Sequence, residues 1–133
     1  MGLFGPSKEF RERTFTAPCT SAEFLHVLKG SSDYEGDTPF GVLLDMAPQE
    51  NPPIAETVYL ESLTSDGFVI AAGNRVKMLW RMQLTLQGNN PVQGTFGALN
   101  VYDERWFGNV LSMNAAISET VRRIGGRTKR WPI

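Results

Sequence analysis

The chain of 133 residues contains one cysteine and one histidine. A lone Cys19 excludes an internal disulfide, and a lone His26 excludes a metal site built from several histidines. No Asn-X-Ser/Thr glycosylation acceptor occurs, and no apolar run approaches the roughly 18–20 residues needed to span a bilayer. These absences predict a cytoplasmic protein without a membrane-spanning segment.

Catalytic and ligand-binding motifs are scarce as well. Cys19 and His26 are separated by roughly 10 Å along a helix, too far for a nucleophile and its base on one rigid helix. The acidic stretch 33–37 opens a segment that lacks the glycine and glutamate of an EF-hand loop. The glycines of 94–97 come without the lysine of a phosphate-binding loop. We therefore predict no catalytic residue, no metal and no cofactor.

The composition is that of a soluble globular protein, with 41% hydrophobic and 20% charged residues. The length predicts a single domain over 1–126, followed by a basic tail at 127–133. Charge is uneven, because eight acids and no Lys or Arg lie between Gly30 and Asn74. Such asymmetry marks either a partner surface or merely solvated loops and tail. We do not expect a nucleic-acid partner for so short a basic tail in an overall acidic chain.

The strongest pattern is the alternation of apolar and polar side chains over 76–87, broken only by Leu79. Period two over this length predicts a long antiparallel strand with one face in a core. Gly73-Asn74 before it predicts a two-residue hairpin turn. Five more strands are expected, at 9–16, 40–46, 58–63, 68–72 and 92–101.

Two helices complete the predicted architecture. Thr20 and Glu23 have the spacing of a capping box, which predicts a short helix ending near Gly30. The segment 104–124 repeats apolar residues every three or four positions, which predicts a long helix. The fold class is therefore α+β: an antiparallel sheet of about six strands, a short helix after the first strand, and a long C-terminal helix packed on the sheet.

The run Arg-Thr-Phe-Thr-Ala-Pro at 13–18, leading into Thr-Ser-Ala-Glu-Phe-Leu at 20–25, resembles the START-like superfamily, as does the terminal helix. This helix-grip superfamily includes polyketide cyclases and lipid-transfer domains. The resemblance implies that the terminal helix lies across the concave face of the sheet, with any ligand between them. A cystatin-like or other α+β roll is the alternative fold.

The resemblance also implies a set of pocket-lining residues, with the hairpin register deciding between Phe96 and Leu99. The expected lining is Met78, Trp80, Met82, Leu84, Phe96, Trp106, Val110, Met113 and Ile117.

Three functions are compatible with this sequence. The first is a non-catalytic binder of a small hydrophobic or aromatic molecule between sheet and helix. The second is an oligomeric interaction domain with a filled core, in which Phe68, Ile70 and Leu79 share the outer sheet face and form a homodimer. The third is a cyclase-type enzyme, for which the chain offers no convincing acid–base pair.

Overall fold

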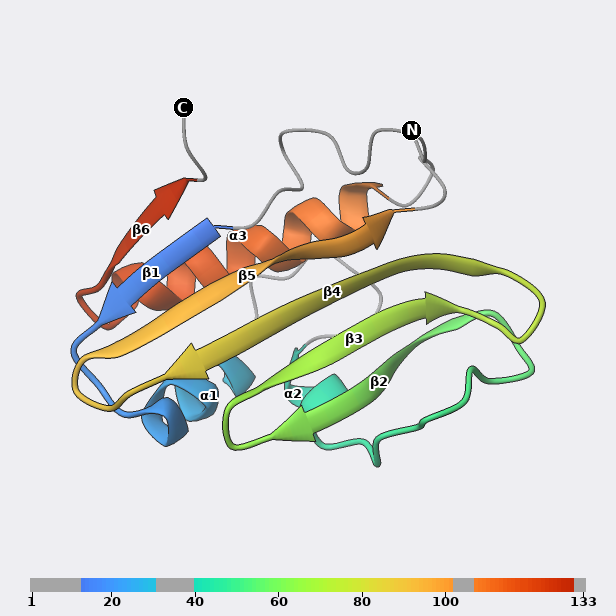
Figure 1. Cartoon of the computed structure of the whole chain (residues 1–133), viewed down its shortest axis with the longest axis horizontal. Coiled ribbons are helices and arrows are strands. Elements are labelled where there is room, and N and C mark those ends of the chain that lie inside the picture. The colour runs from blue at the N-terminus through green and yellow to red at the C-terminus, as the bar shows by residue number, and fades with distance from the viewer. Residues whose placement is uncertain (1–12, 31–39, 102–106, 131–133) are drawn as a thin grey trace.

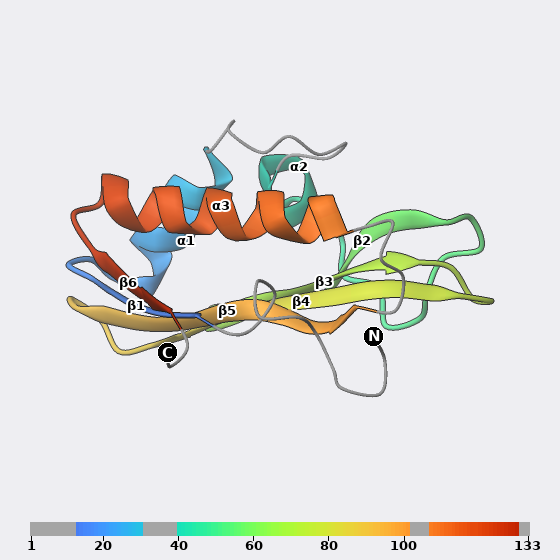
Figure 2. The ribbon, with the colours of Figure 1, turned by 90° about the horizontal axis from the view of Figure 1, so that it is seen from above.

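The computed structural model describes residues 13–30, 40–101 and 107–130. They form one six-stranded antiparallel sheet with the strand order β2-β3-β4-β5-β1-β6. The strands are β1 (Arg13–Ala17), β2 (Thr57–Thr64), β3 (Gly67–Gly73), β4 (Met78–Gln87), β5 (Val92–Val101) and β6 (Arg127–Arg130). Three helices, α1 (Ser21–Lys29), α2 (Phe40–Leu44) and α3 (Phe107–Arg123), lie on one face of the sheet (Figures 1 and 2). The predicted α+β class is confirmed.

Strand β4 organises the core as its alternation predicts. Trp80, Met82 and Leu84 are completely buried on the helix-covered face. In the register of the sheet, Leu84 lies opposite Phe68 on β3 and Phe96 on β5. Because directly paired residues share a face, Phe96 and not Leu99 is the β5 residue that joins this row.

Helix α1 begins at the predicted capping box. The Thr20 hydroxyl accepts a hydrogen bond from the Glu23 amide at 3.1 Å, and the Glu23 carboxylate accepts one from the Thr20 amide at 3.2 Å. Phe24 and Leu28 then point into the core, one turn apart, and both are fully buried. The cap thus sets the start of the helix, and the apolar spacing sets the face that packs on the sheet.

Helix α3 packs against β5, β1, β6 and α1 through the predicted apolar spacing. Met113, Ile117 and Val121 recur every fourth residue on its buried side. Two residues of the predicted pocket lining belong to this segment. Trp106 lies outside the described residues, and the side chain of Val110 is not described either. Among the described residues, no helix is both long and apolar enough to cross a membrane.

The strand predicted at 40–46 is wrong, since Phe40–Leu44 form α2. A short apolar run does not distinguish a buried strand from a buried helical turn. The helical form is favoured here because it places Phe40, Leu43 and Leu44 on one face, where all three are buried against the sheet.

The basic tail is partly structured. Arg127–Arg130 form β6, which pairs antiparallel with β1 at the edge of the sheet. A tight turn returns the chain from α3 to this edge. A β-carbon on Gly126 would fall 2.5 Å from the Thr16 carbonyl oxygen, so only glycine permits this close approach.

The two-residue hairpin predicted at Gly73-Asn74 is also wrong. Strand β3 ends at Gly73 and β4 begins at Met78, with residues 74–77 between them. The Asn74 side-chain oxygen accepts hydrogen bonds from the amides of Val76 and Lys77, at 2.9 and 2.8 Å. Asparagine therefore builds a longer side-chain-stabilised turn in place of the tight one.

The outer-face patch predicted for a homodimer does not exist. Phe68, Ile70 and Leu79 are 3%, 0% and 0% exposed and belong to the hydrophobic core. Phe68 pairs with Leu84, and Ile70 pairs with Met82, so both share the core face of β4. The apolar side chains of β3 therefore face the core and not the outer side of the sheet.

Candidate functional site

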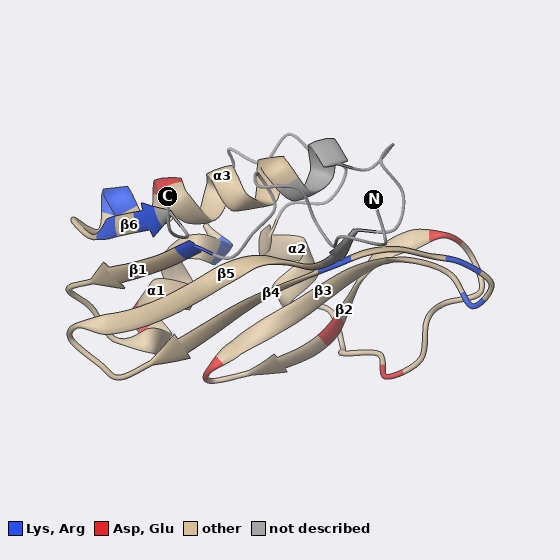
Figure 3. Ribbon diagram, turned by 45° about the horizontal axis from the view of Figure 1, so that its top comes forward, with Lys and Arg blue, Asp and Glu red and all other residues tan. Residues whose placement is uncertain are grey.

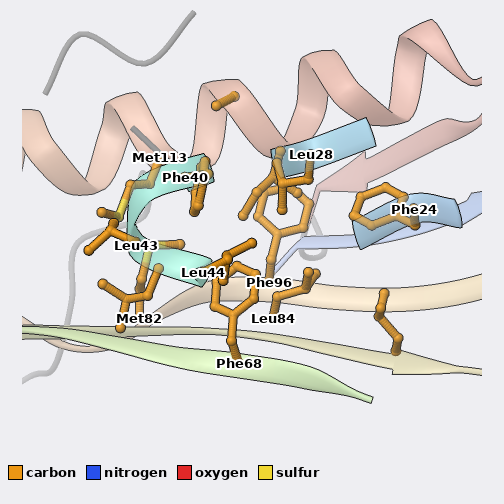
Figure 4. Packing of buried hydrophobic residues seen from close by; sticks show 14 of the residues in the cluster. Phe24, Leu28, Phe40, Leu43, Leu44, Phe68, Met82, Leu84, Phe96 and Met113 are labelled. Atoms are coloured by element: carbon orange, nitrogen blue, oxygen red, sulfur yellow. The ribbon is translucent and has the colours of Figure 1, made fainter. Parts of the chain in front are cut away.

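Most residues predicted to line a pocket under α3 come together in the hydrophobic core. Six of the nine are fully buried in one cluster: Trp80, Met82, Leu84, Phe96, Met113 and Ile117. Met78 is only partly buried at the start of β4. Helices α1 and α2 add apolar side chains to the same space, as Figure 4 shows for Phe24, Leu28, Phe40, Leu43 and Leu44.

This core contains polar atoms that no described residue hydrogen-bonds. They are the indole nitrogen of Trp80, the side-chain amide of Asn114 and the hydroxyl of Ser118. Asn114 is only 1% exposed, and Ser118 lies one turn further along the same side of α3. An unpaired buried polar group costs about 1–3 kcal/mol, so these atoms mark a polar spot in an apolar layer.

The large cavity of the described chain lies on the opposite face of the sheet, where none of the described helices packs (Figure 2). It is an open groove of about 1010 Å³ lined by residues from all six strands. We call it the outer groove. The side chains that face it are mostly polar: Thr14, Thr16, Ser62, Thr64, Gln83, Thr85, Gln87, Gln93 and Thr95.

The register of the sheet arranges these side chains in rows. Thr14 on β1 lies opposite Thr95 on β5, which lies opposite Thr85 on β4. Paired β-carbons are about 4.5–5.5 Å apart, so the hydroxyls form a continuous line across three strands. A parallel row of Thr16, Gln93 and Gln87 lies next to it.

Both rows continue onto β6, where they end in cations. Lys129 lies opposite Thr14, and Arg127 lies opposite Thr16. Both basic side chains are exposed, and neither forms an ion pair within the described residues. Figure 3 shows this basic edge in blue, while Asp66, in the turn between β2 and β3, lines the groove at its other end.

The nearby cations of α3 are in a different situation. Arg122 pairs with Glu119 through hydrogen bonds of 2.6 Å, and Arg123 lies 3.5 Å from the same carboxylate. The hydrogen bond from Arg122 holds the pKa of Glu119 below its usual value. Neither arginine lines the outer groove. The unpaired positive charge of this end of the molecule is therefore concentrated on β6.

A second ion pair lies further along the same sheet face. Arg81 donates to both carboxylate oxygens of Glu61, at 3.1 and 2.5 Å, across the intervening strand β3 at Ala71. Tyr59 lies in the same row, and burial, followed by the nearby charge of Glu61, raises its pKa. This pair neutralises its own charges, so the charges that line the groove are Arg127 and Lys129 on β6 and Asp66 at the opposite end.

The described lining of the outer groove consists largely of hydroxyl, amide and charged side chains. Its lining contains neither cysteine nor histidine. Burial, with a smaller contribution from Glu23, raises the pKa of Cys19 and keeps this thiol protonated on the helix side. No cluster of three or more His, Cys, Asp or Glu occurs within 13–30, 40–101 and 107–130. The described side chains of the groove can form hydrogen bonds and attract anions.

Sequence reasoning missed this site, although one signal was present. Gln83, Thr85 and Gln87 are the polar half of the alternation, whereas the only prediction for the outer sheet face was an apolar dimer patch. Comparisons with protein-family models, with curated proteins and with solved structures gave no match to the chain. The site is therefore defined by its geometry alone.

Proposed function

We propose that the protein is a non-catalytic binding protein that holds an elongated polar anion in the outer groove. One observation carries this proposal: rows of hydroxyl and amide side chains run across the sheet and end at two unpaired cations, Arg127 and Lys129. Threonine and glutamine both donate and accept hydrogen bonds, which suits the hydroxyl or amide groups of a ligand. Arginine and lysine suit its carboxylate, sulfate or phosphate.

The dimensions of the groove favour an elongated ligand. Six strands at a spacing of about 4.8 Å give a width of roughly 24 Å across the strands. Among the described lining residues no aromatic ring is exposed, since the two phenylalanines, Phe15 and Phe68, are each 3% exposed. An acidic oligosaccharide or a short acidic peptide has this combination of length, hydrogen-bonding groups and charge.

A titration tests the proposal with defined probes. A fluorescent sulfated hexasaccharide and a glutamate-rich peptide serve as anions, and an uncharged hexasaccharide serves as the neutral probe. We expect saturable binding of at least one anion that weakens with salt, because charges at an exposed site are screened. The double variant Arg127→Gln/Lys129→Gln should reduce the affinity at least about tenfold, which corresponds to about 1.4 kcal/mol.

The matched control removes the same formal charge from α3. Arg122→Gln/Arg123→Gln changes two arginines that already pair with Glu119 and do not line the groove. This variant should bind the anion as the wild type does. An equal loss in both double variants would show that only net charge matters, and it would overturn the groove as the binding site.

A second candidate function follows from the polar atoms in the core. A hydrophobic ligand with a carbonyl or hydroxyl head could lie under α3 and pair with the amide of Asn114. This is the function expected from the START-like resemblance, with a polar head added to the ligand. A titration with an environment-sensitive hydrophobic dye tests it. Saturable binding that is lost in Asn114→Leu would support it, and no binding by the folded protein would exclude it.

A further inference from the structure

Two aliphatic side chains stand out at the end of the sheet remote from β6. Val76, in the turn between β3 and β4, is 94% exposed, and Ile54, in the segment leading into β2, is 79% exposed. They are the two most exposed large hydrophobic residues of the described chain. Figure 1 shows the β3–β4 turn at the opposite end of the molecule from β6.

Hydrogen bonds fasten the two loops to each other. The Arg75 amide donates to the Pro53 carbonyl oxygen at 3.0 Å, and Arg75 Nε donates to the Pro52 carbonyl oxygen at 3.2 Å. Ile54 directly follows Pro53, and Val76 directly follows Arg75. The two exposed aliphatic residues therefore belong to one unit, which we call the apolar tip (residues 52–54 and 75–77).

The turn that carries Val76 is built by its own hydrogen bonds. Asn74 accepts from the amides of Val76 and Lys77, and its own amide donates to the Lys77 carbonyl oxygen at 2.9 Å. Val76 thus lies at the apex of an ordered turn. Its exposure is a property of that turn. Scattered apolar residues on a surface need no explanation, but two on fastened loops form a defined feature.

The charges at the tip are mainly positive. Arg75 and Lys77 flank Val76 and are exposed. Figure 3 shows blue segments of ribbon at the end of the sheet where β3 turns into β4. Among the described residues of 52–57 and 74–78, Glu56 is the one acid, and it is also exposed. An aliphatic apex beside two cations complements an anionic lipid surface, where apolar side chains enter the interface and cations stay at the level of the phosphates.

We propose that the apolar tip docks the protein onto anionic lipid membranes through Ile54, Val76, Arg75 and Lys77. A protein partner fits less well, because a stable protein interface buries about 800 Å² on each side and two aliphatic side chains at a loop apex offer far less. Shallow insertion into a bilayer buries less area, and the attraction of cations to anionic lipids adds to it. The groove residues of β6 lie at the other end of the sheet and remain accessible in this orientation (Figure 3).

Vesicle flotation with the full chain tests the proposal. The probes are phosphatidylcholine vesicles with and without phosphatidylserine. We expect the wild type to float with the phosphatidylserine vesicles only, and to be released by salt. Ile54→Ser/Val76→Ser should lower the bound fraction at least about fivefold, while the unfolding midpoint stays unchanged because both side chains are exposed. Glu56→Gln should increase binding.

The matched control is Val42→Ser, which changes a 52% exposed aliphatic residue on α2, away from the tip. It should float as the wild type does. Failure of the wild type to float with either vesicle would overturn the proposal, as would an equal loss in Val42→Ser. Sedimentation of the wild type and of Ile54→Ser/Val76→Ser tests whether the tip binds a second copy of the chain instead. A wild-type dimer that Ile54→Ser/Val76→Ser converts to a monomer would assign the tip to a second copy of the chain and reject the membrane.

Discussion

The ring of Phe15 on β1 occupies the place where a side chain on Gly94 of β5 would stand. The two residues are paired across the strands, and a β-carbon on Gly94 would fall 2.2 Å from Phe15 Cζ. The ring cannot withdraw easily, because it is 3% exposed and stacks on Phe24 of α1 with ring centroids 4.8 Å apart. Glycine here lets one aromatic residue join β5, β1 and α1.

We therefore expect Gly94→Ala to destabilise the protein by about 1–3 kcal/mol, the usual cost of overpacking a core. Gly30→Ala is the control. Its added β-carbon would meet the carbonyl oxygens of Val27 and His26 at ordinary distances of 3.5 and 3.9 Å. Urea unfolding should separate the two variants clearly, and equal midpoints would show that Phe15 can move aside.

Trp80 should be among the most costly core residues to truncate. It is the largest fully buried side chain and sits in the middle of the sheet. Trp80→Ala should cost about 3–5 kcal/mol. Trp80→Phe should cost clearly less, because it keeps an aromatic ring and removes an indole N–H that has no described partner. Equal unfolding midpoints for the two variants would contradict this prediction, because a retained aromatic ring would then add nothing to the packing.

The sequence predicted the fold where periodicity was long, and failed where a segment was short or charged. The alternation of β4 and the spacing of α3 each repeat often enough to identify an element and its buried face. Phe40–Leu44 is too short for its period to be read, and α2 was therefore assigned as a strand. Arg127–Arg130 carries no apolar residue, and only its pairing with β1 makes it a strand.

The candidate site was less predictable than the fold. Thr85 and Gln87 were visible as polar positions of β4, but nothing in the chain showed that Thr14 and Thr95 would continue their row. That row depends on the pairing of β1 with β5, which joins segments distant in sequence. The shape of the outer groove depends on the twist of the whole sheet. A pattern within one segment shows neither the pairing of distant strands nor this twist.

The ion pair between Glu61 and Arg81 should contribute modestly to stability. Its geometry is bidentate, but the two side chains are 24% and 33% exposed, so solvent screens part of the attraction. A double-mutant cycle with Glu61→Gln and Arg81→Gln should give a coupling energy of about 0.5–1 kcal/mol. A coupling energy of zero would show that the ion pair contributes nothing to the stability of the fold.

Cys19 gives a prediction about pH. Burial raises the pKa of this thiol in the folded state, so the folded protein retains a proton that the unfolded chain releases. The corresponding stability is complete below the thiol pKa of the unfolded chain and is lost as the pH rises through the folded value. Unfolding midpoints measured from neutral to alkaline pH should therefore decline less steeply in Cys19→Ala than in the wild type. Parallel profiles would contradict the assignment to Cys19, and would leave Tyr59, whose pKa is also raised, as the cause.

The central claim is that ligand binds on the outer groove, and amide chemical-shift mapping of the ¹⁵N-labelled protein tests it most directly. The sulfated hexasaccharide is the probe, titrated at low salt. We predict that the shifts concentrate at Thr14, Thr85, Gln93 and Lys129, which four different strands bring to this face. Shifts concentrated instead at the Trp80 indole and the Asn114 side-chain amide, beneath α3, would contradict the groove as the binding site.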